Sequence, residues 1–145
     1  MRYDAFIGQV QAVAALPNRG SAARATSAVL RTLAERLPDG TADHLFAQLP
    51  ADLVAEIEGP QVPRRGGGKR HKGGPAAERF DLPTFSGRVA WRGRVSDDTA
   101  TRYVSTVFEV LDAAVAPELM DKVADALPRD IGQLLPAARI DDPLD

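Results

Sequence analysis

The sequence predicts an all-α protein, built from two tandem pseudo-symmetric four-helix repeats that pack into a helical bundle and are joined by a flexible basic linker rich in Gly and Arg. Two observations lead to this prediction. Apolar residues recur at helical spacing in both halves of the chain, and these apolar positions repeat between the halves at a nearly constant offset. Of the 145 residues, 44 % are hydrophobic and 26 % are charged, which is typical of a globular protein.

The internal repeat is marked by a Leu-Pro dipeptide, which stands at Leu49-Pro50 and again at Leu127-Pro128, 78 positions later. The same offset pairs further apolar residues in order along the chain. These pairs are Val29 with Val107, Leu30 with Phe108, Leu33 with Leu111, Leu37 with Val115, Leu45 with Val123, Leu53 with Ile131 and Ile57 with Leu135. An ordered run of this kind favours duplication over chance similarity between amphipathic helices.

Nearer the start of each half the offset becomes 79, because Phe6 pairs with Phe85 and Val10 with Val89. A one-residue insertion or deletion in a loop explains this change. We therefore expect four parts along the chain: helical repeat 1 at 1–59, the flexible basic linker at 60–82, helical repeat 2 at 83–136 and an acidic tail at 137–145.

In the first repeat, apolar residues at helical spacing predict a helix over 3–15, which Leu16-Pro17-Asn18-Arg19-Gly20 interrupts. Ser21 is the expected N-cap of the second helix. Pro38-Asp39-Gly40 ends that helix. Thr41 is the expected cap of a short third helix, and Pro50 suits the first turn of a fourth.

The second repeat follows the same plan, with a first helix near 83–94. Ser96, Asp97 and Asp98 form an acidic start for the second helix, which complements the helix dipole. Pro117 and Pro128 open the last two helices. One repeat of about 60 residues is marginally stable alone, so we expect the two to pack together. The linker is long enough for docking within one chain or for exchange between two chains.

The expected linker contains the most functional-looking segment, residues 63–74, which carry five cations and no acid. The net charge of the whole chain is −2, so the rest of the chain carries −7. Arg and Lys can neutralise phosphates, and Gly lets a backbone follow a groove. The candidate nucleic-acid contacts are therefore Arg64, Arg65, Lys69, Arg70 and Lys72. The alternatives are a solvated tether without that role, or contact with an anionic membrane surface or with another copy of the chain.

No residue set indicates catalysis, and we expect no enzyme activity, no cofactor and no metal site. There is no cysteine, and the two histidines are His44, expected on an exposed helix face, and His71, in the linker. Gly66-Gly67-Gly68-Lys69 is no phosphate-binding loop, because Pro63 and Arg70 stand where the motif needs glycine and a hydroxyl residue.

Trp91 is the single tryptophan. Our first interpretation is that it closes a seam between helices. The alternative is an anchor for a partner, since tryptophan is enriched at binding hot spots. Arg88, Arg92 and Arg94 surround it in the sequence, so an exposed Trp91 would belong to an anion-binding patch.

The N-terminal residues lack an apolar run and contain Asp4, so they do not predict a signal peptide. No window approaches the ~20 apolar residues of a membrane span. We therefore expect a cytoplasmic protein.

Three segments carry a resemblance to a known family: Phe6-x-x-x-Val10, Leu45-x-x-x-Leu49-Pro50 and Phe85-Ser86-Gly87-Arg88-Val89-Ala90. The chain resembles the bacterial "domain of unknown function 2267" family over nearly its whole length. The resemblance implies a helical fold and no established activity, and fusions of family members to nucleotide-sensing domains imply a regulatory role. We therefore expect a non-enzymatic interaction or regulatory module that binds a protein partner or itself. The alternative is a nucleic-acid-binding accessory protein that uses the basic linker.

Overall fold

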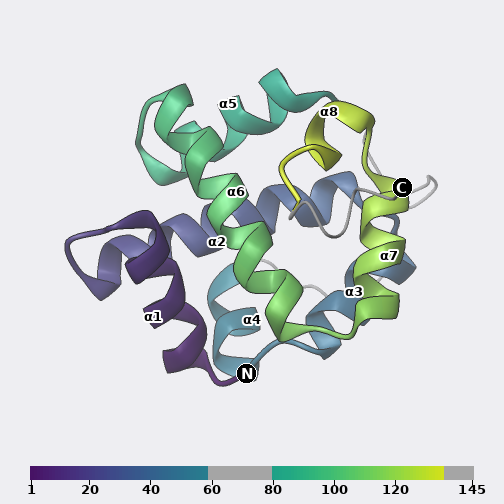
Figure 1. The fold of residues 1–145 in the computed structure, drawn as a ribbon, viewed down its shortest axis with the longest axis horizontal. Coiled ribbons are helices and arrows are strands. Elements are labelled where there is room, and N and C mark those ends of the chain that lie inside the picture. Colours follow the sequence, from purple (N-terminus) through teal and green to yellow (C-terminus); the bar gives the residue numbers. More distant parts are fainter. Residues whose placement is uncertain (59–79, 136–145) are drawn as a thin grey trace, which may run out of the picture.

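The computed structural model describes residues 1–58 and 80–135, and every regular element within these ranges is a helix (Figure 1). The helices are α1 (Tyr3–Ala14), α2 (Arg19–Arg36), α3 (Asp39–Ala47), α4 (Ala51–Glu58), α5 (Leu82–Gly93), α6 (Asp97–Ala114), α7 (Pro117–Ala126) and α8 (Arg129–Gly132). The predicted all-α class is confirmed for this part of the chain. Most of the expected linker and the whole acidic tail lie outside the described residues.

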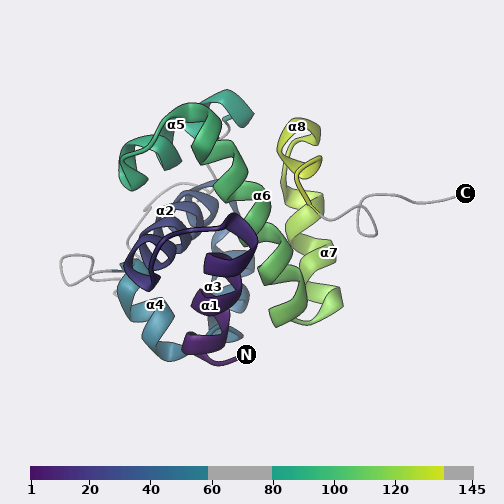
Figure 2. The same cartoon turned by 60° about the vertical axis from the view of Figure 1, so that its left-hand side comes forward.

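The two longest helices, α2 and α6, lie against each other in the middle of the molecule (Figures 1 and 2). Helix α1 packs on both of them, and so does α5. Further along, α3 packs against α7. Helices from residues 1–58 therefore interleave with helices from residues 80–135 and do not form a separate body.

One hydrophobic core runs through this arrangement and takes residues from both described ranges. Phe6 on α1, Leu30 on α2 and Phe108 on α6 are all fully buried. The Phe85 ring of α5 meets the Phe108 ring edge to face, with ring centroids 6.2 Å apart and an interplanar angle of 76°. Removal of this apolar surface from water is the main source of stability of such a bundle. None of the helices in 1–58 and 80–135 is long and apolar enough to cross a membrane.

The two central helices begin in the same way, with a polar side chain that caps the first turn. The Asn18 side chain accepts a hydrogen bond of 2.8 Å from the Ser21 amide, and the Ser96 hydroxyl accepts one of 3.2 Å from the Thr99 amide. The prediction of Ser21 as the cap of α2 is wrong, because the cap is Asn18, three residues earlier, and the Ser21 amide donates to it. The acidic start predicted for α6 is found at Asp97 and Asp98.

Helix α3 starts at Asp39, directly after Pro38, so the prediction that Thr41 caps it is also wrong. Proline fixes its own φ and lets the chain enter a helix at the next residue, and Asp39 in the first turn complements the helix dipole. The residue before α7 is held by a distant side chain, because the Ala116 amide donates to Gln48 Oε1 at 2.7 Å. Such a long-range contact cannot be read from local sequence.

Helices α1 and α5 end alike, on a residue in the left-handed conformation. Ala15 has φ 56° and Arg94 has φ 60°, and among the described residues these are the non-glycine residues with positive φ. The next amide then donates back into the helix, from Leu16 to the Gln11 carbonyl at 2.9 Å and from Val95 to the Ala90 carbonyl at 3.0 Å. Glycine is the usual residue at such an end, and another residue costs about 1 kcal/mol there.

We predict that Phe108→Ala lowers the free energy of unfolding by about 3–5 kcal/mol, because it removes a fully buried ring and leaves a cavity. Urea denaturation of the full chain measures this loss. Val13→Ala is the matched control, since the Val13 side chain is 51 % exposed and its truncation should change stability by no more than about 0.5 kcal/mol. Equal shifts in the two variants would contradict the assignment of Phe108 to the core.

Candidate functional site

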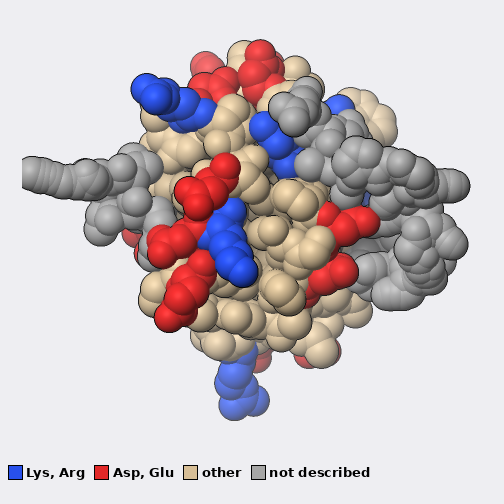
Figure 3. Space-filling model, turned by 90° about the vertical axis from the view of Figure 1, so that its right-hand side faces the viewer, with Lys and Arg blue, Asp and Glu red and all other residues tan. Residues whose placement is uncertain are grey.

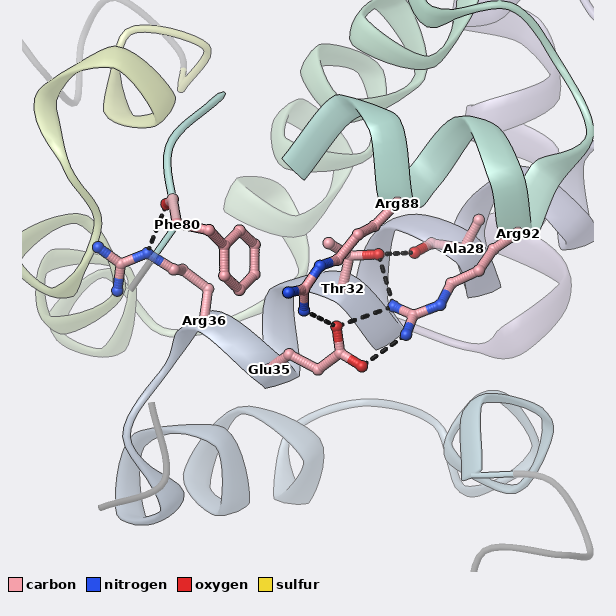
Figure 4. Close-up of polar contacts among 7 residues, drawn as sticks. All are labelled: Ala28, Thr32, Glu35, Arg36, Phe80, Arg88 and Arg92. Atoms are coloured by element: carbon pink, nitrogen blue, oxygen red, sulfur yellow. Dashed lines mark hydrogen bonds and ion pairs between the residues drawn. The ribbon is translucent and has the colours of Figure 1, made fainter. Parts of the chain in front are cut away.

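A cluster of charged residues joins α5 to α2 beside the core (Figure 4). Glu35 of α2 accepts hydrogen bonds from two arginines of α5. Arg88 Nη1 donates to Glu35 Oε1 at 2.8 Å, and Arg92 Nη2 donates to Glu35 Oε2 at 2.5 Å. Arg88 and Arg92 stand four positions apart, which places them on one face of a helix. Both carboxylate oxygens of Glu35 are therefore paired.

Thr32 extends this cluster into the core. Its hydroxyl accepts from Arg92 Nη1 at 2.8 Å and donates to the Ala28 carbonyl at 2.8 Å. Thr32 is fully buried, so both of its hydrogen-bonding roles are satisfied without water. The Arg92 guanidinium is thus fixed by two residues of α2, one charged and one neutral.

Phe80 is held between two arginines on the other side of the cluster (Figure 4). The Arg88 guanidinium carbon lies 4.0 Å from the centroid of the Phe80 ring, within the range of a cation–π interaction. Arg36 Nε donates to the Phe80 carbonyl at 3.1 Å, and Arg36 Nη1 donates to the Ala126 carbonyl at 3.3 Å. The segment that leads into α5 is thereby fastened to the end of α2.

The protonation of Glu35 follows from these contacts. Burial raises the pKa of this carboxyl, but the hydrogen bonds and charges of Arg92 and Arg88 together lower it more. Its pKa therefore lies below the ordinary value of 4.5, and Glu35 is ionised at neutral pH. A carboxylate that is ionised and paired on both oxygens acts as a structural counter-ion, and it has no proton to give as a general acid.

An open groove lies beside this cluster and is centred on Trp91. The Trp91 side chain is 82 % exposed, so the interpretation of Trp91 as a closed seam between helices is wrong. The groove has a volume of about 960 Å³, and Arg31, Arg92 and Arg94 contribute to its walls. Its remaining lining residues are Gly87, Ala90, Trp91, Val95, Ser96 and Asp97.

Gly87 keeps the groove open. It lies one helical turn before Trp91, and a Cβ added there would have nothing within 4 Å. Gly87, Trp91 and Arg92 also line a second, adjoining hollow of about 440 Å³. The exposed indole therefore stands free of the side chains around it, with arginines nearby, and this arrangement suits the binding of a partner that is both apolar and anionic.

The structure places the other candidate residues as follows. Arg64, Arg65, Lys69, Arg70 and Lys72 all lie outside the described residues, as does His71. His44 is exposed on α3, as its helix pattern predicts. Within the described ranges, no three acidic or histidine side chains gather closely enough to hold a metal ion.

The sequence patterns did not identify Glu35 or Arg31 as residues of this site. The four-residue spacing of Arg88 and Arg92 signals that the two share a helix face and favour an acid opposite. That signal alone does not identify Glu35 among the acids of the chain, because the pairing depends on how α5 crosses α2. Arg31 lines the groove because α2, on which it lies, is crossed by α5.

We predict that Glu35→Gln lowers the free energy of unfolding at pH 7 by about 1–3 kcal/mol, the range for a hydrogen-bonded charged group. The folded-state pKa of Glu35 is lowered, so its stabilisation is present above about pH 4.5 and is lost as the pH falls through the folded-state value. The difference between the two proteins should therefore shrink below about pH 4.5. Chemical denaturation at several pH values measures it.

The matched control is Asp4→Asn, which removes an exposed ion pair. Arg19 Nη2 and Asp4 Oδ1 lie 2.8 Å apart, and their side chains are 52 % and 87 % exposed. Such a pair contributes about 0–1 kcal/mol. A pH-independent loss in Glu35→Gln, or a loss no greater than in Asp4→Asn, would show that the charge of Glu35 does not hold α5 on α2.

Comparison with known proteins identifies a family. No curated protein matches the chain. One family model, described as "Uncharacterized conserved protein (DUF2267)", matches residues 3–134 and so takes in all the helices described above. The resemblance seen in the apolar pattern is thereby confirmed, and the chain belongs to the DUF2267 family of uncharacterized conserved proteins.

Proposed function

We propose that this chain is a non-enzymatic interaction module, with a regulatory role, that binds a protein partner in the groove around Trp91. The observation that carries the proposal is the 82 % exposure of the Trp91 side chain. Tryptophan is mostly buried in folded proteins, and a large exposed apolar ring stays in contact with water at a cost in free energy. A partner that covers Trp91 removes that cost.

The groove is also built to bind with little loss of freedom. Arg92 is already fixed by Glu35 and Thr32. Trp91 and Gly87 lie on a helix, so the backbone under the groove is rigid. A surface that is ordered before binding has less conformational entropy to lose, which favours affinity.

We further propose that the chain is an internal duplication joined by a basic linker. Helices α1 and α5 each have 12 residues, and α2 and α6 each have 18, which supports this origin. The positive-φ residues Ala15 and Arg94 stand at the same offset of 79 as Phe6 and Phe85. At that offset Trp91 pairs with Ala12, so the first repeat has no counterpart of the indole in the groove.

A second candidate function is nucleic-acid binding through the linker cations, and the +5 charge of residues 63–74 favours it. The remaining −7 opposes broad contact with a duplex, because acidic surfaces repel the phosphate backbone. For either function we propose a cytoplasmic location, as expected from the N-terminal residues. If the chain is an interaction module, we propose that the linker is only a tether between the two repeats.

We predict that peptides selected by display on the full chain depend on the Trp91 groove. Affinity should fall at least ~10-fold in Trp91→Ala, which removes the anchor. It should fall similarly in Gly87→Leu, which fills the groove and leaves Trp91 in place. Gly40→Leu is the matched control, because a Cβ added at Gly40 also has nothing within 4 Å. Peptides that bind all four proteins equally would refute the groove as the binding surface.

The nucleic-acid alternative predicts a steep salt dependence. Titration of labelled duplex DNA, single-stranded DNA and RNA should give a log–log slope of magnitude up to about 4 for five phosphate contacts. A variant with the five linker Arg and Lys residues changed to Ser should then lose binding. If the unchanged protein binds none of the three at moderate salt, this alternative is wrong and the linker is a tether.

A further inference from the structure

We propose that the occupant of the Trp91 groove is an acidic peptide segment of a partner protein, in which an apolar side chain lies on the indole and flanking carboxylates pair with Arg31 and Arg94. This inference rests on the proposed function and names the chemistry of the partner. Three features of the groove carry it: its apolar floor, its two available guanidinium groups and the charge of the surface around it.

The floor of the groove is apolar. Trp91 presents its ring, and Ala90 and Val95 lie beside it in the lining. Val95 is partly buried and packs against the core, so this floor is continuous with the interior of the protein. A leucine-sized side chain placed on the indole would remove apolar surface from water on both partners. The apolar floor therefore favours a ligand with at least one apolar residue.

Two of the three arginines in the groove walls are available to a ligand. Arg92 is engaged by Glu35 and Thr32. Arg31 and Arg94 have no hydrogen bond or ion pair with any described residue. A guanidinium group binds a carboxylate through two parallel hydrogen bonds, which gives geometric specificity as well as charge. Two such groups beside one ring match an apolar residue with an acid on each side.

The backbone at Arg94 supports a role for its side chain. Arg94 holds a left-handed conformation with φ 60°, where glycine is the usual residue. Ala15 holds the corresponding place after α1, so the conformation itself is a property of the fold. The arginine at this place adds a charge to the groove, and glycine would be better accommodated by the backbone.

The surroundings favour a short acidic peptide over a nucleic acid. Asp97 lines the groove itself, and Asp98 is exposed next to it. Acidic side chains are also spread over the face that bears α7 (Figure 3), where Glu118, Asp121 and Asp125 are exposed. Asp97 and Asp98 would repel a long polyanion at the groove itself, and the acids of α7 would repel one that spread over that other face. A peptide with a few carboxylates needs only Arg31 and Arg94.

Trp91 is the single tryptophan of the chain, so its fluorescence reports directly on the groove. The probes are three short peptides of one design: a central Leu flanked by Glu on both sides, the same peptide with Gln in place of Glu, and the same with Lys. Titration into the full chain should blue-shift the emission with the Glu peptide. The Gln peptide should bind at least ~10-fold more weakly, and the Lys peptide should leave the emission unchanged.

Variants then assign the carboxylate contacts. Arg31→Gln and Arg94→Gly should each weaken the Glu peptide about 3–10-fold and leave the Gln peptide unaffected. Ala15→Gly is the conformational control, because it makes the same backbone change away from the groove. Arg129→Gln is the charge control, since Arg129 is exposed on α8 near the opposite end of α5. Both controls should bind the Glu peptide as the unchanged protein does, and thermal denaturation confirms that each variant is folded.

Each other outcome overturns the inference in a distinguishable way. Equal binding of the Glu and Lys peptides would make the groove a purely apolar site. A single-stranded oligonucleotide that shifts Trp91 at lower concentration than the Glu peptide would make the occupant a nucleic acid. If no probe shifts Trp91 but displayed peptides still bind in a manner that depends on Trp91, the acidic partner is wrong and the interaction module stands. If displayed peptides do not depend on Trp91 either, both proposals fail.

Discussion

The packing of α5 across α2 is the constraint on which the rest of the structure depends. Phe85 and Val89 bury one face of α5, and the Glu35 carboxylate fixes the neighbouring face through Arg88 and Arg92. Once those two faces are fixed, the helix period of 3.6 residues turns Gly87 and Trp91 outward. The exposed indole is therefore a consequence of how the core and the ion pairs are filled. A rotation of α5 that buried Trp91 would separate Arg88 and Arg92 from Glu35.

The fold class was predictable because burial of apolar side chains on one helix face produces a periodic pattern in the sequence. Apolar residues at helical spacing marked all the longer helices, and proline or a polar cap marked most of their starts. The errors fell where two residues compete for one role. Asn18 and Ser21 can both cap a helix, and only the geometry of the loop decides that Asn18 is the acceptor. Helix α3 begins at Asp39, before the expected cap, and no side chain caps its first turn.

The groove was predictable in composition but not in form. The sequence shows Trp91 with arginines at positions 88, 92 and 94, and it leaves a buried seam and an exposed patch both open. The choice between them depends on Glu35 and Arg31, which lie more than fifty residues earlier in the chain and reach α5 only through tertiary packing. The local sequence pattern does not show how α5 crosses α2. It also could not show that two of the four arginines are neutralised by one carboxylate.

Helix α7 is completed at both ends by side chains from the other described part of the chain. Gln48 accepts from the Ala116 amide at its start, 68 positions away, and Arg36 donates to the Ala126 carbonyl at its end, 90 positions away. A helix of this length is marginal by itself in water. Arg36 and Gln48 thus stabilise the ends of a helix to which they do not belong. A change at either residue would therefore remove a hydrogen bond from one end of α7, although that helix lies in the other half of the chain.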